Sequence, residues 1–106
     1  MNNAKLTSIL RESGVEVYAS EAFEQPLPYI VYDEIRRRAR CADDLGILPI
    51  RTLSVKYYTS HVDDGMTEQL SSILGKSRIP HSISFRLDVE RGYTVCDFMC
   101  EVKGNA

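Results

Sequence analysis

Residues 25–34 read QPLPYIVYDE, and this stretch predicts the most strand-like segment of the chain. Tyrosine, isoleucine and valine dominate its second half, and aromatic and β-branched residues favour β-strands. Proline has a fixed φ and no backbone N–H, and it pushes the residue before it toward extended geometry. Pro26 and Pro28 therefore set the point at which pairing can begin, and we expect a strand over residues 29–36.

Both faces of this expected strand carry apolar side chains. Tyr29, Val31 and Ile35 fall on one face at the two-residue period of a strand, and Ile30 and Tyr32 fall on the other. A strand that is apolar on both faces is either central in its sheet or covered on each side. We therefore expect this strand to lie inside the sheet.

The flanking segments complete one α+β domain. Working outward, the apolar spacing predicts a helix and a strand before the central strand, and a long loop, a strand, a helix and two strands after it. The expected ranges are 4–13 (helix), 15–19, 29–36, 37–49 (loop), 50–58, 66–74 (helix), 79–89 and 93–102, with Gly75 ending the second helix. Residues 1–106 thus predict a single domain, an antiparallel or mixed β-sheet of about five strands with two helices on one face.

Alternation marks the last two expected strands. In residues 79–89 the odd-numbered side chains share a face, and His81 lies among them. Residues 93–102 place Cys96 and Cys100 on one face about 13 Å apart, beyond the reach of a disulfide. We therefore expect these two cysteines to be buried and to pack as small apolar side chains.

The composition is that of an ordinary soluble globular protein. The chain has 106 residues, 13 basic and 15 acidic side chains and a formal net charge of −2 at pH 7. Nothing in this balance points to nucleic acid or to an anionic membrane. Three cysteines without a spaced framework do not indicate a secreted disulfide scaffold, and the N-terminus does not resemble a signal peptide. We therefore expect a reducing cytoplasmic setting and no membrane partner.

The sequence contains no enzyme motif. It has no glycine-rich phosphate loop, no G-x-S-x-G elbow and no H-E-x-x-H zinc motif. His61 is close to Asp63 and Asp64, but no motif brings a serine or a cysteine beside them. Cys41 lies among arginines that would favour its thiolate, without a histidine in view to support a nucleophile role. We therefore expect no enzymatic activity, no cofactor and no metal site.

A basic run begins at the end of the expected central strand. Arg36, Arg37, Arg38 and Arg40 are four arginines in five positions. Such a run can contact phosphate groups, which makes a nucleic-acid-binding module the alternative function. Against this alternative, the chain is net acidic and the run lacks the interleaved aromatics that single-strand binders use. Because the planar fork of arginine also pairs with carboxylates at protein interfaces, we favour a protein contact.

An ordered set of sequence pieces resembles a known protein family. The pieces are ILRESG, VEVYA, PLPYIVYDE, LSVKYYTSHVDD, MTEQLSSIL and YTVCDFMCEV, in that order along the chain. Over residues 6–102 they are similar to the small tail-completion proteins of tailed bacteriophages and prophages. These proteins are commonly labelled tail terminator, head–tail joining or minor tail proteins. The Arg36–Arg40 cluster and the less charged final strand depart from the family pattern.

The resemblance implies a structural virion assembly protein without enzymatic activity. Tail terminators form a ring homo-oligomer, typically a hexamer, that caps the tail tube and joins it to the head connector. The implied partners are further copies of the chain, the tail-tube protein and a head-completion or connector protein. Transient contact with packaged DNA is a further option, as is a role as another neck or minor tail component. The implied location is the virion tail or neck, after assembly in the bacterial host cytoplasm.

The long loop after the central strand is the expected contact with a neighbouring subunit or with the lumen of the ring. A loop of this length in a compact domain is uncommon and often carries function. The candidate contact residues are Arg36, Arg37, Arg38, Arg40, Asp43, Asp44, Leu45, Ile47 and Leu48.

Overall fold

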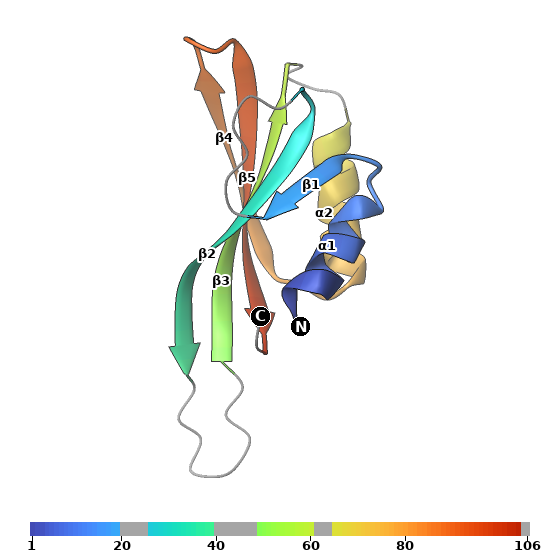
Figure 1. The fold of residues 1–106 in the computed structure, drawn as a ribbon, viewed down its shortest axis with the longest axis vertical. Helices are drawn as coiled ribbons and strands as arrows, with labels where there is room; N and C mark the ends of the chain where they lie inside the picture. The colour runs from blue at the N-terminus through green and yellow to red at the C-terminus, as the bar shows by residue number, and fades with distance from the viewer. Residues whose placement is uncertain (20–25, 40–48, 61–64, 105–106) are drawn as a thin grey trace.

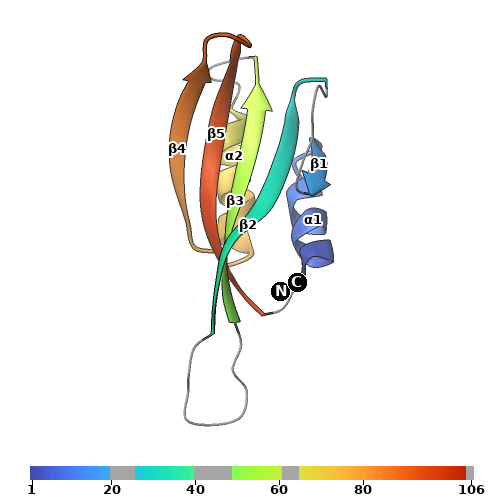
Figure 2. The ribbon, with the colours of Figure 1, turned by 60° about the vertical axis from the view of Figure 1, so that its left-hand side comes forward.

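The computed structural model describes residues 1–19, 26–39, 49–60 and 65–104. The described strands form one mixed sheet in the order β1-β2-β3-β5-β4, and the two helices lie on the same face of it (Figure 1 and Figure 2). The predicted α+β fold is thereby confirmed. In chain order the elements are α1 (Asn3–Arg11), β1 (Glu16–Ala19), β2 (Tyr29–Ala39), β3 (Pro49–Thr59), α2 (Met66–Lys76), β4 (His81–Asp88) and β5 (Tyr93–Lys103).

Strand β2 occupies an interior position between β1 and β3, as its two apolar faces predict. It begins at Tyr29, directly after the cis Leu27–Pro28 peptide bond. The short β1 pairs with it in parallel, whereas β2–β3, β3–β5 and β5–β4 are antiparallel pairs. The chain therefore crosses from β3 through α2 to β4, and β5 returns between them.

The predicted end of the central strand was wrong. Strand β2 continues to Ala39 and pairs there with Pro49–Thr52, so that Arg37 and Arg38 belong to a strand and not to a loop. The register of this pair shifts between Glu34 and Arg36. Such a bulge inserts an extra residue and interrupts the two-residue alternation from which the strand was predicted.

The helix boundaries follow local capping. The side chain of Asn2 accepts a hydrogen bond of 2.8 Å from the backbone N–H of Lys5, which satisfies one of the unpaired donors at the start of α1. Gly75 does not end α2 as predicted but lies inside its last turn. The positive φ that follows the helix is at Arg78, at 58°.

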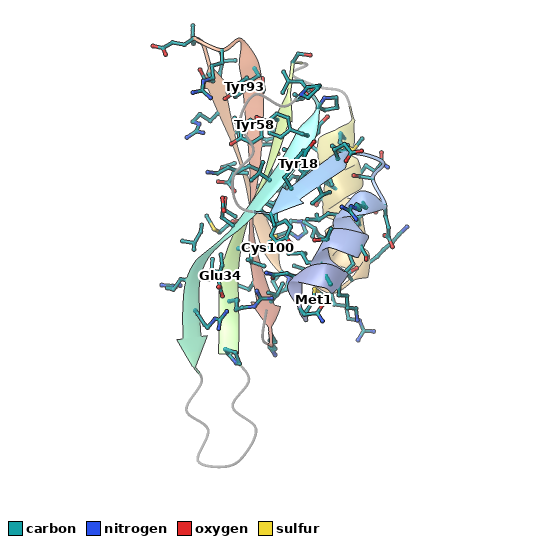
Figure 3. The ribbon with its side chains drawn as sticks, in the orientation of Figure 1. Met1, Tyr18, Glu34, Tyr58, Tyr93 and Cys100 are labelled. Atoms are coloured by element: carbon teal, nitrogen blue, oxygen red, sulfur yellow. The ribbon has the colours of Figure 1, made fainter. Side chains whose placement is uncertain are left out.

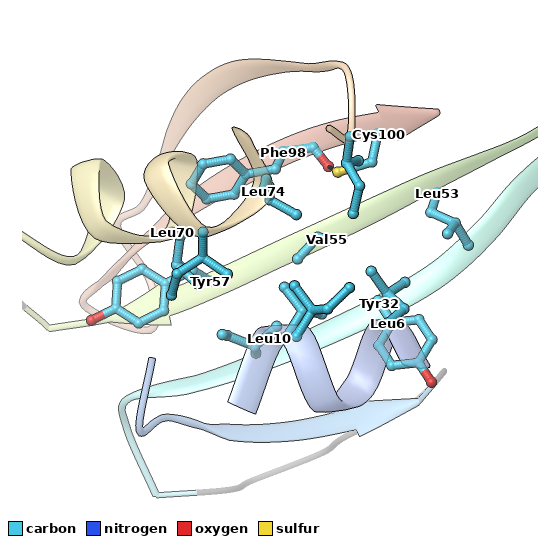
Figure 4. Packing of buried hydrophobic residues seen from close by; sticks show 14 of the residues in the cluster. Leu6, Leu10, Tyr32, Leu53, Val55, Tyr57, Leu70, Leu74, Phe98 and Cys100 are labelled. Carbon is cyan, nitrogen blue, oxygen red and sulfur yellow. Dashed lines mark hydrogen bonds between the residues drawn. The ribbon is translucent and has the colours of Figure 1, made fainter. Parts of the chain in front are cut away.

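The core lies between the helices and one face of the sheet (Figure 4). Leucines from both helices pack there against alternate residues of the central strands, and Cys96 and Cys100 are buried among them as predicted. Burial of this apolar surface is the main force that fixes the helices on the sheet. The apolar side chains with 0% exposure are Leu6, Leu10, Ile30, Val55, Leu70, Leu74, Phe98 and Cys100.

Tyrosine rings cover the upper part of the opposite face of the sheet in the view of Figure 3. Tyr29 stacks on Tyr58 with ring centroids 4.7 Å apart, and Tyr18 and Tyr93 meet this pair edge-on. The pKa values of Tyr29 and Tyr58 are raised, mainly because burial disfavours the phenolate. The second apolar face of β2 is thus covered by aromatic side chains, and no described helix packs over it.

Candidate assembly surface

A stripe of exposed apolar side chains runs along the edge strand β4. The register of β4 with β5 places Ile83 opposite Phe98 and Phe85 opposite Cys96, on the face that the helices cover elsewhere. Yet Phe85 is 62% exposed and Leu87 is 63% exposed. We name the exposed side chains Ile83, Phe85 and Leu87, together with Val89 directly after the strand, the β4 stripe.

The stripe is exposed because the helix layer ends before it reaches the edge of the sheet. Helix α2 contacts the beginning of β4, where the Ser71 hydroxyl and the His81 Nε2 are 2.8 Å apart. Beyond His81, Ile83 and Phe85 border a hollow whose other lining residues are on α2, namely Thr67, Glu68 and Ser71. An apolar stripe on an unpaired edge strand is a template for pairing with another chain.

The sheet has a second unpaired edge at its other side. Among the described residues, β1 pairs with β2 over Tyr29–Tyr32 alone, so that the remaining part of β2, Asp33–Ala39, pairs there with β3 and with no other strand. Ile35 is 55% exposed at the bulge on this segment. We name residues 33–39 the free β2 edge.

Two of the predicted contact residues lie exposed on this edge. Arg37 donates hydrogen bonds from Nε and Nη2 to the two carboxylate oxygens of Glu34, at 2.9 and 3.1 Å. This bidentate pair lowers the pKa of Glu34, chiefly through the hydrogen bond from Arg37, and raises the pKa of Arg37. Arg36 is exposed next to the pair, opposite Thr52 of β3. Because Arg37 already has an anionic partner, its charge is partly compensated before any ligand binds.

The structure does not describe the side chains of the other predicted contact residues. The backbone of Arg38 is in β2, and nothing describes its side chain. The remaining candidates fall outside the described residues, and so do Cys41, His61, Asp63 and Asp64. Those remaining candidates are Arg40, Asp43, Asp44, Leu45, Ile47 and Leu48.

Sequence reasoning missed a buried arginine. Arg51 is fully buried, and its guanidinium donates hydrogen bonds to the carbonyl oxygens of Gly104 and Met1 and to the Asn3 Oδ1. The three acceptors come from the two ends of the described chain. Arg51 is therefore a structural residue that joins β3 to the start of α1 and to the end of β5.

The described residues contain no cluster of side chains that suits metal binding. No group of three histidine, cysteine or acidic side chains lies close enough within residues 1–19, 26–39, 49–60 and 65–104 to hold a metal ion. A hollow of about 330 Å³ near Ile50, Ile79 and Val102 has no histidine, cysteine or serine among its lining residues. The helices of the described chain are also too short or too polar to cross a membrane.

Comparison with known proteins adds no family assignment. No protein-family model matches the chain, and no curated protein matches it.

Proposed function

We propose that this protein is a structural subunit of a tailed bacteriophage or prophage, which assembles with copies of itself into a ring. The ring, a hexamer in this proposal, caps the tail tube and joins it to the head connector in the neck of the virion. Assembly takes place in the bacterial host cytoplasm. The partners are other copies, the tail-tube protein and the head-completion or connector protein. The subunit has no enzymatic role.

The observation that carries this proposal is the β4 stripe on an unpaired edge strand. Natural proteins usually protect such an edge with charges, a proline or a covering element, because it otherwise pairs with another chain. Here the edge presents apolar side chains from Ile83 to Leu87 instead. A ring further requires that one patch meets a different patch on the neighbour, and the free β2 edge supplies a second patch.

Light scattering across protein concentration, combined with electron microscopy of negatively stained particles, tests the proposal. We expect closed rings, with six-fold symmetry, either from the protein alone or after addition of tail-tube protein. Phe85→Arg should abolish these rings, because it places a charge in the stripe without removing a buried side chain. Ser8→Arg is the matched control, because Ser8 is exposed on α1. The neighbouring Thr7 is not used because its hydroxyl is hydrogen-bonded to Tyr32. Absence of rings under both conditions would contradict the proposal.

A nucleic-acid-binding module remains the second candidate, supported by the adjacent exposed side chains of Arg36 and Arg37. It requires binding to short DNA or RNA whose affinity falls steeply with salt, with a log–log slope of several units. Under this alternative, Arg36→Ala together with Arg37→Ala should remove binding and leave assembly intact. The ion pair of Arg37 with Glu34 argues against it, because a phosphate would have to compete with a carboxylate that is already bound.

A further inference from the structure

The two unpaired edges of the sheet are complementary in strand direction. Strand β2 is antiparallel to β3, β3 to β5 and β5 to β4. A second copy placed in the same orientation therefore brings its β2 antiparallel to the β4 of the first. The helices of both copies then lie on the same face of one continuous sheet.

We propose that copies join head to tail through pairing of the β4 edge of one copy with the free β2 edge of the next. This inference rests on the self-assembly in the proposed function and specifies the two surfaces that meet. Main-chain hydrogen bonds would supply affinity, as in other cases where a strand is added to a sheet edge. Because the two patches differ, the contact is heterologous and can repeat until a ring closes.

The side-chain faces restrict the register of this pairing. Successive residues of a strand point to opposite faces, so only registers that differ by two residues keep the helices on one side. One allowed register places Asp33 of the second copy opposite Arg86 of the first. Arg36 then lies opposite Ser84, whose partner on β5 is Asp97. The first arrangement pairs opposite charges directly, and the second directs Arg36 toward an acid one strand further away.

The neighbouring registers are less favourable. If the register is shifted by two residues toward the end of β4, Asp33 would face Asp88 and Arg36 would face Arg86, so that like charges would be opposed. With a shift of two residues in the other direction, β1 of the second copy would block the second half of β4, from Phe85 to Asp88. In the favoured register the pairing ends at Arg86, because Ala19 of β1, paired with Tyr32, occupies the next place, and Leu87 and Asp88 at the end of β4 must turn away from β1. Charge thus selects this register, whereas β1 alone would favour the register shifted toward Asp88, which leaves all of β4 clear of β1.

This register also covers part of the β4 stripe. Ile83 lies opposite Arg37, and Phe85 lies opposite Glu34, so the ion pair that joins these two side chains lies over the stripe. The methylene groups of long charged side chains can cover apolar surface while their heads stay in water. Exposed Ile35, at the bulge between Glu34 and Arg36, adds apolar surface to the same contact.

Charge reversal with mixing tests the pairing. Arg86→Asp alone and Asp33→Arg alone each oppose like charges, and each should weaken association by about tenfold or more. In an equimolar mixture, alternating copies of the two variants bring opposite charges together at every contact, so the mixture should regain mass that neither variant reaches alone. The double variant Asp33→Arg/Arg86→Asp restores opposite charges at every contact and should regain the mass of the unaltered assembly. Lys5→Asp, a charge reversal on α1 and on neither strand, should not alter the mass.

The outcomes separate this inference from the proposed function. If Arg86→Asp reduces the mass but Asp33→Arg does not, or if the double variant stays dissociated, the β4–β2 pairing is wrong although self-assembly stands. An assembly whose mass is unchanged by both reversals would exclude the pairing in the same way. If the unaltered protein is monomeric at every soluble concentration and on its tail tube, both proposals fail. Circular dichroism of each variant checks that loss of mass is not loss of folding.

Discussion

The Nε of Arg51 donates a hydrogen bond of 3.1 Å to the carbonyl oxygen of Gly104, and both residues are buried. The same guanidinium reaches the Asn3 Oδ1 at 2.8 Å and the Met1 carbonyl oxygen at 2.7 Å. A single side chain of β3 thus satisfies acceptors from both ends of the described chain. The charge is tolerated in the interior because these polar groups surround it.

Replacing Arg51 with methionine should destabilise the fold. The substitution keeps apolar bulk but removes every donor for the three oxygen acceptors, and we expect a loss of about 3 kcal/mol in the free energy of unfolding. Urea denaturation followed by circular dichroism measures this loss. Lys5→Met, at an exposed position of α1, should change stability by less than about 0.5 kcal/mol. Equal effects of the two substitutions would refute the structural role of Arg51.

Two phenylalanines should separate stability from assembly. Phe98 is fully buried in the core, and Phe98→Ala should cost about 3–5 kcal/mol because it leaves a cavity. Phe85 is mostly exposed in the β4 stripe, and Phe85→Ala should change stability by less than about 0.5 kcal/mol. In light scattering, however, Phe85→Ala should reduce the mass of the assembly. A large loss of stability for Phe85→Ala would show that this side chain belongs to the core of a single subunit.

The order of the elements and the position of β2 could be predicted because they depend on local chemistry. Pro26 and Pro28 determine where β2 begins, and its apolar side chains on both faces indicate an interior strand. The bulge at Ile35 breaks the alternation, and the pairing with β3 that carries β2 on to Ala39 is a contact between separate parts of the chain. Arg37 and Arg38 therefore belong to a strand where the local pattern predicts a loop.

The exposure of the β4 stripe depends on tertiary structure and could not be predicted from the sequence. The alternation of Ile83, Phe85 and Leu87 is the pattern of a half-buried strand, and it correctly predicts β4. Whether that apolar face is covered depends on how far α2 extends across the sheet, which the pattern does not contain. Likewise, Arg51 looks like any strand arginine until the two ends of the chain are placed around it.

The thiol of Cys100 should be protected from reaction in the folded protein. Burial, with a smaller effect of Asp97, raises its pKa to about 12 from the ordinary value of 9.0, so the reactive thiolate is scarce near neutral pH. At pH 8 we expect alkylation of Cys100 only as fast as the protein unfolds, and much faster in urea. Peptide mass spectrometry distinguishes Cys100 from the other cysteines. Rapid labelling of Cys100 under native conditions would contradict its burial.

The raised pKa of Cys100 also predicts a dependence of stability on pH. The unfolded thiol loses its proton above 9.0, whereas the folded thiol keeps it until about 12. The unfolded state therefore binds fewer protons in this range, and the free energy of unfolding decreases as pH rises from 9.0 toward about 12. Cys100→Ala should remove this component of the slope, which comparison of urea denaturation at pH 8 and pH 10 measures. Identical slopes for the two proteins would contradict it.

The ion pair on the free β2 edge should be visible in the titration of Glu34. The hydrogen bonds from Arg37 favour the carboxylate, so the pKa of Glu34 should lie below its ordinary value of 4.5. The pair therefore stabilises the folded protein above pH 4.5, and this contribution is lost as pH falls through the lowered pKa. Carbon-detected NMR of the side-chain carboxyl measures the titration. Arg37→Ala should return the pKa toward 4.5, whereas Arg36→Ala should leave it low because, within the described part of the chain, Arg37 is the residue that binds the carboxylate. A pKa of Glu34 that is insensitive to Arg37→Ala would mean that Arg37 is available to an external anion, which is the condition that nucleic-acid binding requires.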